Sequence, residues 1–268
     1  MRCWRVFIVA MLSTGLAIAV FHRWNRTNDI GVARATAELS QRLSIPIVAS
    51  GISFPVRTYY GEINGSDAAP ATVTSYLPIL AAEWGLYPQS AIQSTALRRI
   101  ILCDGLTFAG QRRTAIPDFE HNDLYLDVAR GRYDDLYTRR VIHHEFFHII
   151  DYRDDGELYA DARWAELNPG GFTYGSGGTN AQNDSTASLM TNDRPGFLNT
   201  YSATGVEEDK AEVFANMIVN GRLLAARAAT DLVLHAKMER MKELLAKFCP
   251  EIDEAFWEAA EKVERPAR

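Results

Sequence analysis

The segment His144-Glu145-Phe146-Phe147-His148 holds the residues whose types and spacing are best suited to chemistry. On an α-helix, residues four apart lie on one face about one turn apart, so both imidazoles can reach a single metal ion while Glu145 projects beside them toward a water molecule. With six histidines among 268 residues, chance placement gives this pattern about one time in a hundred. Two hydrogen-bonded core histidines are the structural alternative, but a buried glutamate between them without a partner is costly. The segment therefore predicts a metal site.

A second pair of candidate ligands, Glu208 and Glu212, lies in a predicted helix over residues 206–220. Four residues separate the two carboxylates, so they stand one turn apart on that helix. A catalytic zinc ion has three protein ligands and one open position. One carboxylate can supply the third ligand, and the other can hold a ligand histidine by its free ring N–H. The alternative is a solvated acidic helix start, which the helix dipole also favours.

The HEFFH segment together with the E-D-K-A-E sequence of residues 208–212 resembles the gluzincin metallopeptidases. More narrowly, it is similar to bacterial zinc-binding metallopeptidases and to the catalytic domain of anthrax lethal factor. The resemblance implies that His144, His148 and Glu208 bind Zn²⁺, with Glu212 behind a ligand histidine. One alternative stays open, because the E-V-F-A-N sequence that begins at Glu212 also matches the ligand helix of some related zincins. In that register Glu212 would be the ligand.

The resemblance also implies roles for two further residues. Glu145 is expected to act as the general base, taking a proton from water and returning it to the departing amine. Tyr201 lies seven residues before Glu208, the spacing at which lethal factor carries a tyrosine thought to steady the oxyanion. The implied function is zinc-dependent hydrolysis of a peptide or protein substrate. The alternatives are a membrane-anchored zinc-binding interaction module without turnover and an amide hydrolase acting on a cell-wall substrate.

The elements that must position these residues follow from hydrophobic periodicity. Apolar positions at helical spacing predict an active-site helix over residues 134–151. Residues 99–108 predict a strand, and the alternation in residues 123–128 predicts a half-buried strand whose edge an extended peptide could join. Helices are predicted over residues 72–86 and 231–248. Together they predict an α+β, zincin-like metallopeptidase domain with a small mixed sheet, an active-site helix and a helical C-terminal half.

A polar segment between residues 169 and 200 separates the second histidine from Glu208, and its residues 170–178 include five glycines. A loop of this length in a compact domain is either functional or disordered. Phe172 and Tyr174 could line a substrate cleft. Aromatic side chains that anchor a loop to the core are the commoner arrangement, so both interpretations stay open.

The distribution of charge argues against a nucleic-acid partner. Residues 1–26 carry four arginines and no acidic residue, and the remainder has 24 basic against 34 acidic side chains. Nucleic-acid binding depends on clustered positive charge, which this remainder lacks. Three cysteines are too few for a disulfide framework. Cys103 and Cys249 could pair in an exported protein, but two buried thiols are the favoured interpretation.

Residues 6–21 form an almost unbroken apolar run flanked by arginines, which is typical of an export signal. The run is long for a signal peptide and short for a membrane span, which takes about 20 residues. A signal anchor is favoured over a cleaved signal peptide. The body is expected outside the cytoplasm in both cases, membrane-anchored or, if cleaved, secreted or periplasmic. The predicted organisation is a signal anchor or signal peptide (1–26), a tether and first helix (27–43) and a zincin-like metallopeptidase domain (44–268).

Overall fold

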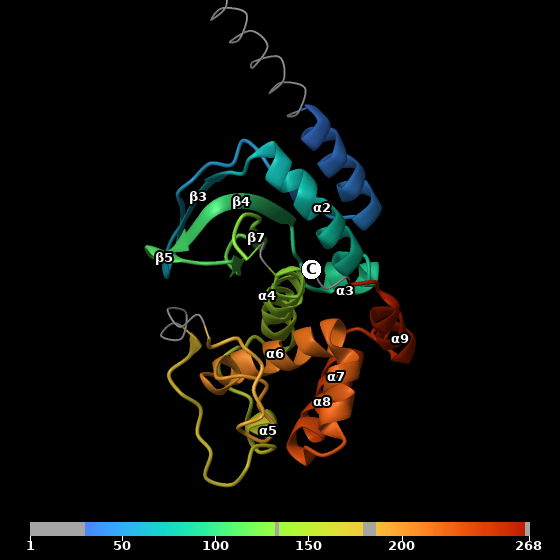
Figure 1. The fold of residues 1–268 in the computed structure, drawn as a ribbon. Helices are drawn as coiled ribbons and strands as arrows, with labels where there is room; N and C mark the ends of the chain where they lie inside the picture. Colours follow the sequence, from blue (N-terminus) through green and yellow to red (C-terminus); the bar gives the residue numbers. More distant parts are fainter. Residues whose placement is uncertain (1–29, 132–133, 179–185, 266–268) are drawn as a thin grey trace, which may run out of the picture.

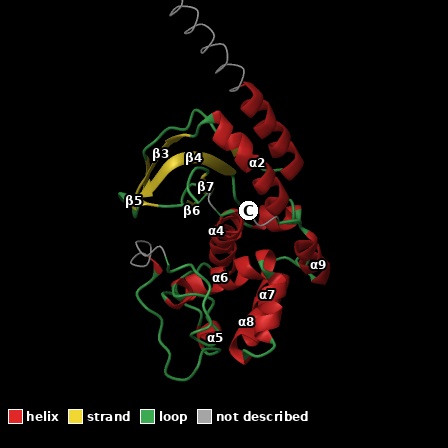
Figure 2. Ribbon diagram, viewed as in Figure 1, coloured by secondary structure: helices red, strands yellow, loops and turns green. Residues whose placement is uncertain are grey.

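The computed structural model describes residues 30–131, 134–178 and 186–265 (Figure 1). The strands gather at one end of the molecule and helices form the rest (Figure 2). The strands are β1 (Ile47–Val48), β2 (Val56–Thr58), β3 (Gly61–Asp67), β4 (Arg99–Phe108), β5 (Gln111–Arg112), β6 (Ala115–Asp118) and β7 (Asp123–Asp127). The helices are residues 30–43, α2 (Pro70–Trp84), α3 (Gln89–Ser94), α4 (Asp135–Asp155), α5 (Ala162–Ala165), the 3₁₀ turn η2 (Tyr201–Ala203), α6 (Val206–Val219), α7 (Gly221–Ala228), α8 (Leu232–Phe248) and α9 (Glu254–Lys262).

The sheet is small and mixed, as predicted. Its main path is β2-β3-β4-β7-β6, and β1 and β5 also pair with β4. The β4–β7 and β1–β4 pairs are parallel, and the other pairs are antiparallel. In Figure 1 the long, curved β4 arches over one side of α4, and α6, α7 and α8 lie on the other side. The fold is therefore α+β, with the predicted small sheet, central helix and helical C-terminal half.

The prediction of a half-buried edge strand at residues 123–128 is wrong. Strand β7 lies between β4 and β6, and all five of its residues are buried. Its two aspartates are buried because they have polar partners. Asp123 accepts hydrogen bonds from Nε and Nη2 of the Arg99 guanidinium, and Asp127 accepts backbone N–H bonds, including one from Leu106 at 3.0 Å. Strand β6 is the terminal strand of the sheet path on this side.

Helix α4 runs through the centre of the molecule. Its first turn is capped by the carboxylate of Asp134, which accepts the N–H groups of Leu136 and Tyr137, a favourable end for a helix N-terminus. The helix ends at Gly156, whose φ of 82° suits glycine. It is one turn longer at its C-terminus than predicted, because Tyr152 still packs on the fold through Phe119, with ring centroids 4.8 Å apart.

The main core joins the sheet, α2, α4 and the C-terminal helices. Aromatic rings connect the layers. The ring centroids of Trp84 in α2 and Phe146 in α4 lie 4.5 Å apart, and those of Phe147 in α4 and Phe214 in α6 lie 5.1 Å apart. A smaller apolar cluster around Tyr125 covers the other face of the sheet. Phe146 and Phe147 therefore connect α4 to two different helices, α2 and α6.

Helix α6 is buried over all fourteen of its residues. The alternative of a solvated acidic helix start is therefore wrong, even for the acidic residues of its first turn. Helix α8 follows the predicted range closely and is capped by the Asp231 carboxylate. Helix α2 and strand β4 also lie where the sequence predicts them.

The predicted export segment, residues 1–26, lies outside the described residues. Within the described ranges, no helix combines the length and apolar character needed to cross a membrane. Residues 30–43 are helical, while the division of the chain into three parts stays a prediction. Cys103 and Cys249 are both buried and free, so the interpretation as two buried thiols is confirmed for this pair.

Candidate metal centre

Three side chains from two helices converge on one point. His144 Nε2 lies 3.1 Å from His148 Nε2 and 3.0 Å from Glu208 Oε2, and His148 Nε2 lies 3.4 Å from the same oxygen. The potential ligand atoms of these three residues all lie within 4.8 Å of one another. The structure therefore brings together the three residues that the sequence analysis proposed as zinc ligands.

Helix packing produces this convergence. His144 and His148 stand four residues apart and face the same side of α4, and Glu208 lies in the first turn of α6. Contact between α4 and α6 through Phe147 and Phe214 brings the two helix faces together. The exposed fractions of His144, His148 and Glu208 are only 7%, 7% and 8%, so the site is largely shielded from solvent.

The donor atoms fit a zinc ion. The Nδ1 atom of His144 lies 3.1 Å from Glu212 Oε1, so a metal ion bound at Nε2 would leave the ring proton on Nδ1, where Glu212 accepts it. Two imidazole nitrogens and one carboxylate oxygen facing a common point leave lone pairs opposed unless a cation lies among them. This set is typical of catalytic zinc sites.

The electrostatics of the site also favour a cation. Burial lowers the pKa of His144, but hydrogen bonds to Glu208 and Glu212 outweigh burial and raise it well above its ordinary value. Burial raises the pKa of Glu208, yet the two histidines dominate and hold it well below its ordinary value. The carboxylates therefore stay ionised and stabilise a positive charge at this point, either the proton on His144 or a metal ion that replaces it.

Glu212 lies behind His144 and is itself held in place. Its Oε2 accepts hydrogen bonds from the side-chain amides of Asn199 at 2.7 Å and Asn216 at 3.3 Å. The three-residue ligand cluster contains Glu208 and does not contain Glu212. This geometry supports the register in which Glu212 orients a ligand histidine.

Two further predicted residues lie at the site. The Tyr201 hydroxyl donates a hydrogen bond to Glu208 Oε1 at 2.8 Å, and its ring centroid is 5.9 Å from that of His144. Glu145 is not a member of the ligand cluster. Burial raises the pKa of Glu145, and the positive charges of the two histidines act in the opposite direction, so the carboxylate is a stronger base than an exposed glutamate.

Sequence reasoning missed a buried ion pair beside the third ligand. Asp209 Oδ2 accepts hydrogen bonds from Lys237 Nζ at 2.7 Å, Trp164 Nε1 at 2.9 Å and the Tyr174 hydroxyl at 2.5 Å. Tyr174 therefore anchors the long loop to α6, and Phe172 packs within the loop, with its ring centroid 4.5 Å from that of the buried Phe197. The sequence did contain a signal for this ion pair, because Lys237 lies at helical spacing between the buried Leu234 and Met241 of α8, and a lysine in such a position needs a buried partner.

A second buried network surrounds His143, the histidine next to the metal cluster. His143 Nε2 lies 2.9 Å from Glu83 Oε2, and its Nδ1 lies 2.6 Å from the Tyr87 hydroxyl. Glu83 also pairs with Arg139 and with Arg265 near the C-terminus. No local pattern could reveal this network, since its members come from distant parts of the chain.

Two other polar residues near the site have defined neighbours. Asp151 accepts a hydrogen bond from Lys210 Nζ at 2.7 Å, so it links α4 to α6 in addition to lying near the helix end. Arg113, between β5 and β6, contributes positive charge that acts on both Glu145 and Glu208. Its position before the terminal strand was not anticipated.

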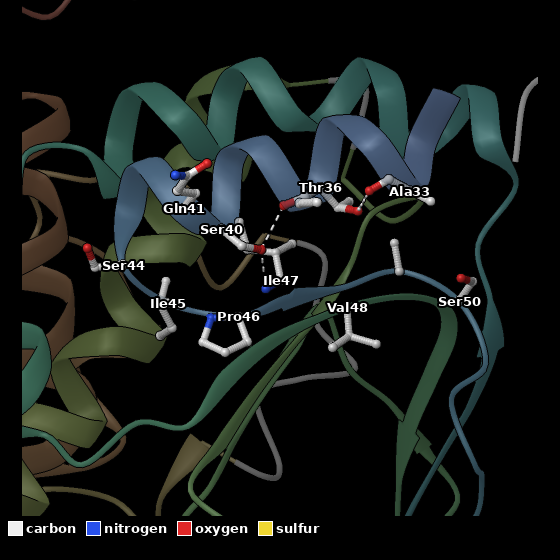
Figure 3. A pocket seen from close by; sticks show the side chains of 12 residues that line it. Ala33, Thr36, Ser40, Gln41, Ser44, Ile45, Pro46, Ile47, Val48 and Ser50 are labelled. Carbon is white, nitrogen blue, oxygen red and sulfur yellow. Dashed lines mark hydrogen bonds between the residues drawn. The ribbon is translucent and has the colours of Figure 1, made fainter. Parts of the chain in front are cut away.

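A separate hollow of about 610 Å³ lies between the helix of residues 30–43 and the segment 44–50 (Figure 3). Ser40 bridges its two sides by donating to Thr36 O at 2.6 Å and accepting the Ile47 N–H at 2.8 Å. None of the residues of the metal cluster lines this hollow, so the hollow and the chemical site are different places.

The chain is similar to proteins described as zinc-binding metallopeptidases. The model of a protein family described as "Putative zinc-binding metallo-peptidase" matches residues 116–248 of the chain, a range that includes both ligand helices. A crystal structure described as a putative zinc-binding metallo-peptidase from Bacteroides caccae ATCC 43185 matches with a TM-score of 0.57, covering 89% of this chain and 92% of that one. At 16% identity, this likeness shows the fold alone. No curated protein matches the chain.

Proposed function

We propose that the protein is a zinc-dependent metallopeptidase of the gluzincin type, similar in its site to the lethal factor catalytic domain. The observation that supports this function is the convergence of His144, His148 and Glu208 beside a fourth residue, Glu145, that is not a ligand. Zn²⁺, when bound, polarises a substrate carbonyl and promotes ionisation of a water molecule. A protein that only binds zinc needs no base beside its ligands.

Glu145 is the proposed general base. It follows His144 directly in α4 and therefore lies at the edge of the ligand cluster. Burial raises its pKa, which strengthens it as a proton acceptor while the nearby histidines keep it from becoming fully neutral. In the reaction, the carboxylate takes a proton from the attacking water and delivers it to the amine nitrogen as the peptide bond breaks.

Tyr201 is the proposed donor to the developing oxyanion. Its hydroxyl already lies at the ligand cluster, where it donates to Glu208 Oε1. Its pKa is raised well above the ordinary value, mainly by burial and then by the charge of Glu208. The phenol therefore stays protonated and remains a hydrogen-bond donor at neutral pH. Loss of one such donor costs about 10²–10³-fold in turnover.

The proposed substrate is an extended peptide or protein segment. Since β7 is an interior strand, the strand that such a segment could join is β6, the terminal strand of the sheet path beside α4. Pairing with a strand edge fixes the peptide backbone by main-chain hydrogen bonds without demanding a particular sequence. An amide in a cell-wall polymer is the alternative substrate for the same site.

Glu145→Gln tests turnover separately from binding. The variant is expected to keep its fold and its zinc, measured by metal analysis, and to lose about 10²–10⁴-fold in the rate of peptide-library cleavage. A chelator added to the wild type is the control for metal dependence. If wild type and variant both hold zinc and neither cleaves peptides or cell-wall amides, the protein is a zinc-binding module and the enzyme proposal fails.

His148→Ala and the two glutamate variants test the ligand set. His148→Ala and Glu208→Ala are expected to lose stoichiometric zinc. Glu212→Ala should bind zinc about 10–100-fold more weakly, because it only orients His144. Zinc affinity measured by competition with a chromogenic chelator distinguishes these cases. Loss of metal in Glu212→Ala with retention in Glu208→Ala would assign the ligand to Glu212.

We also propose that the N-terminal apolar run exports or anchors the chain, so that residues 44–268 act outside the cytoplasm as one metallopeptidase domain. The observation behind this proposal is the 6–21 run between arginines. A periplasm-active reporter fused to the C-terminus should be active in a bacterial host. Activity of a cytoplasm-specific reporter at the same position would contradict it.

A further inference from the structure

The glycine-rich segment of residues 175–178 lies directly on the metal site. Gly178 is buried, and a methyl carbon built on its Cα would lie less than 3.0 Å from both Glu208 Oε1 and Tyr201 Oη. Real side chains essentially never approach so closely. The backbone at Gly178 therefore packs against the carboxylate of a proposed metal ligand and against the proposed oxyanion donor.

Two backbone hydrogen bonds hold this segment in place. The Gly175 N–H donates to the Ala203 carbonyl at 3.2 Å, and the Gly177 N–H donates to the Thr204 carbonyl at 2.7 Å. Both acceptors lie in the short connection between Tyr201 and Glu208. Gly177 has a φ of +87°, a conformation that glycine adopts without strain and other residues rarely adopt.

The N-terminal side of the segment is firmly attached. There, Tyr174 is fixed by its hydrogen bond to Asp209 and Phe172 by its contact with Phe197. Gly175 and Ser176 are exposed, so water can replace the backbone hydrogen bonds of the segment when it lifts. The structure thus combines a fixed anchor at Tyr174 with a short segment, residues 175–178, that has only one side chain and lies on the metal site.

We propose that residues 175–178 form a cover that closes the metal site in the resting protein and must move off Glu208 and Tyr201 before a peptide can enter. This proposal rests on the proposed function, in which Tyr201 meets the substrate carbonyl. In the closed position the Tyr201 hydroxyl is turned to Glu208 and Gly178 lies against it. Substrate access is then set by the opening of the cover.

Gly177→Ala tests the cover in the full-length, zinc-loaded protein. Alanine disfavours the left-handed backbone that the closed segment requires, so the open form should become roughly 5–30-fold more populated. The rate of zinc transfer to an excess of chelator should rise by a similar factor. Gly170→Ala is the matched control, because it lies in the same loop and an added methyl there meets nothing within 4 Å; its rate should equal that of the wild type.

Gly178→Ala provides a second variant if Gly177→Ala folds poorly. Its methyl cannot coexist with the present positions of Glu208 Oε1 and Tyr201 Oη, so either the segment lifts or these side chains shift. Displaced side chains alone would speed zinc release, so for this variant the cover is tested by the exchange of the segment itself. Amide hydrogen exchange of the 175–178 segment, measured by mass spectrometry, serves as a readout that needs neither zinc nor turnover. Exchange in this segment should be faster in both variants than in Gly170→Ala.

The outcomes separate the cover from the proposed function. Zinc release and amide exchange at wild-type rates in both variants would overturn the cover, even if the protein cleaves peptides. Faster release and exchange in a protein that cleaves nothing would support the cover and count against the peptidase. If peptides are cleaved, the open variants should also show a higher kcat/KM than the Gly170→Ala control.

Discussion

Replacement of Lys237 by methionine should destabilise the fold far more than loss of a surface lysine. The Lys237 and Asp209 side chains are both completely buried, with Nζ and Oδ2 2.7 Å apart. Burial raises the pKa of Asp209 and lowers the pKa of Lys237. For both groups, desolvation outweighs the mutual attraction, so burying the pair costs free energy. Removing one partner costs more, because it leaves the other charge buried and unpaired.

The magnitude follows from what the variant leaves behind. Lys237→Met leaves the Asp209 carboxylate buried with two neutral donors, Trp164 and Tyr174, while Asp209 Oδ1 has no hydrogen-bond partner among the described residues. It also removes the hydrogen bond from Nζ to the Gly196 carbonyl at 2.9 Å. Breaking one side of a buried ion pair costs about 3–5 kcal/mol. For a domain of this size that is a fall in Tm of roughly 6–20 °C.

Urea denaturation followed by circular dichroism measures the loss of unfolding free energy. Lys247→Met is the control, because Lys247 is 73% exposed and pairs with Asp154 at 3.3 Å, so its loss should cost less than about 1 kcal/mol. The double variant Lys237→Met/Asp209→Asn should recover part of the stability, since no unpaired charge remains. Equal stabilities for Lys237→Met and Lys247→Met would refute the reasoning.

Two further predictions concern buried ionisable groups. Burial raises the pKa of Glu83, but hydrogen bonds from His143 and Arg265 outweigh it and hold the pKa well below its ordinary value of 4.5. The stabilising contribution of this carboxylate is therefore present above pH 4.5 and is lost as the pH falls through the lower folded-state value. The destabilisation caused by Arg265→Met should accordingly be larger at pH 7 than at pH 3, and a pH-independent difference in urea midpoints would contradict this. Burial raises the pKa of Cys103 to about 12, so iodoacetamide at pH 8 should label Cys103 only after unfolding; peptide mass spectrometry that finds it labelled in the native protein would count against its burial.

The sequence could predict the helices and strands that have a strong local pattern. The active-site helix, β4 and α8 follow from apolar spacing along the chain, because a helix or strand repeats its geometry every few residues. The same periodicity put His144 and His148 on one face before any fold was known. These features depend only on neighbours in sequence, and a single chain contains that information.

The environment of each element was decided by contacts between distant residues. The alternation in β7 is the pattern of a half-exposed strand, but Arg99 and the Leu106 N–H satisfy its two aspartates, so both faces are buried. The acidic first turn of α6 is the pattern of a solvated helix end, but packing against α4 buries it. A polar residue can be buried when it has a hydrogen-bond partner, and the sequence does not show which distant residue will be that partner.

The metal site shows the same division. The local spacing gave two carboxylates one turn apart, Glu208 and Glu212, and left open which one faces the histidines. Only the packing angle of α6 on α4 turns Glu208 toward the Nε2 atoms and Glu212 toward His144 Nδ1. The placement of Gly178 on Glu208 likewise depends on where the long loop returns, because that position is fixed by contacts with Thr204 and Asp209, residues far along the chain.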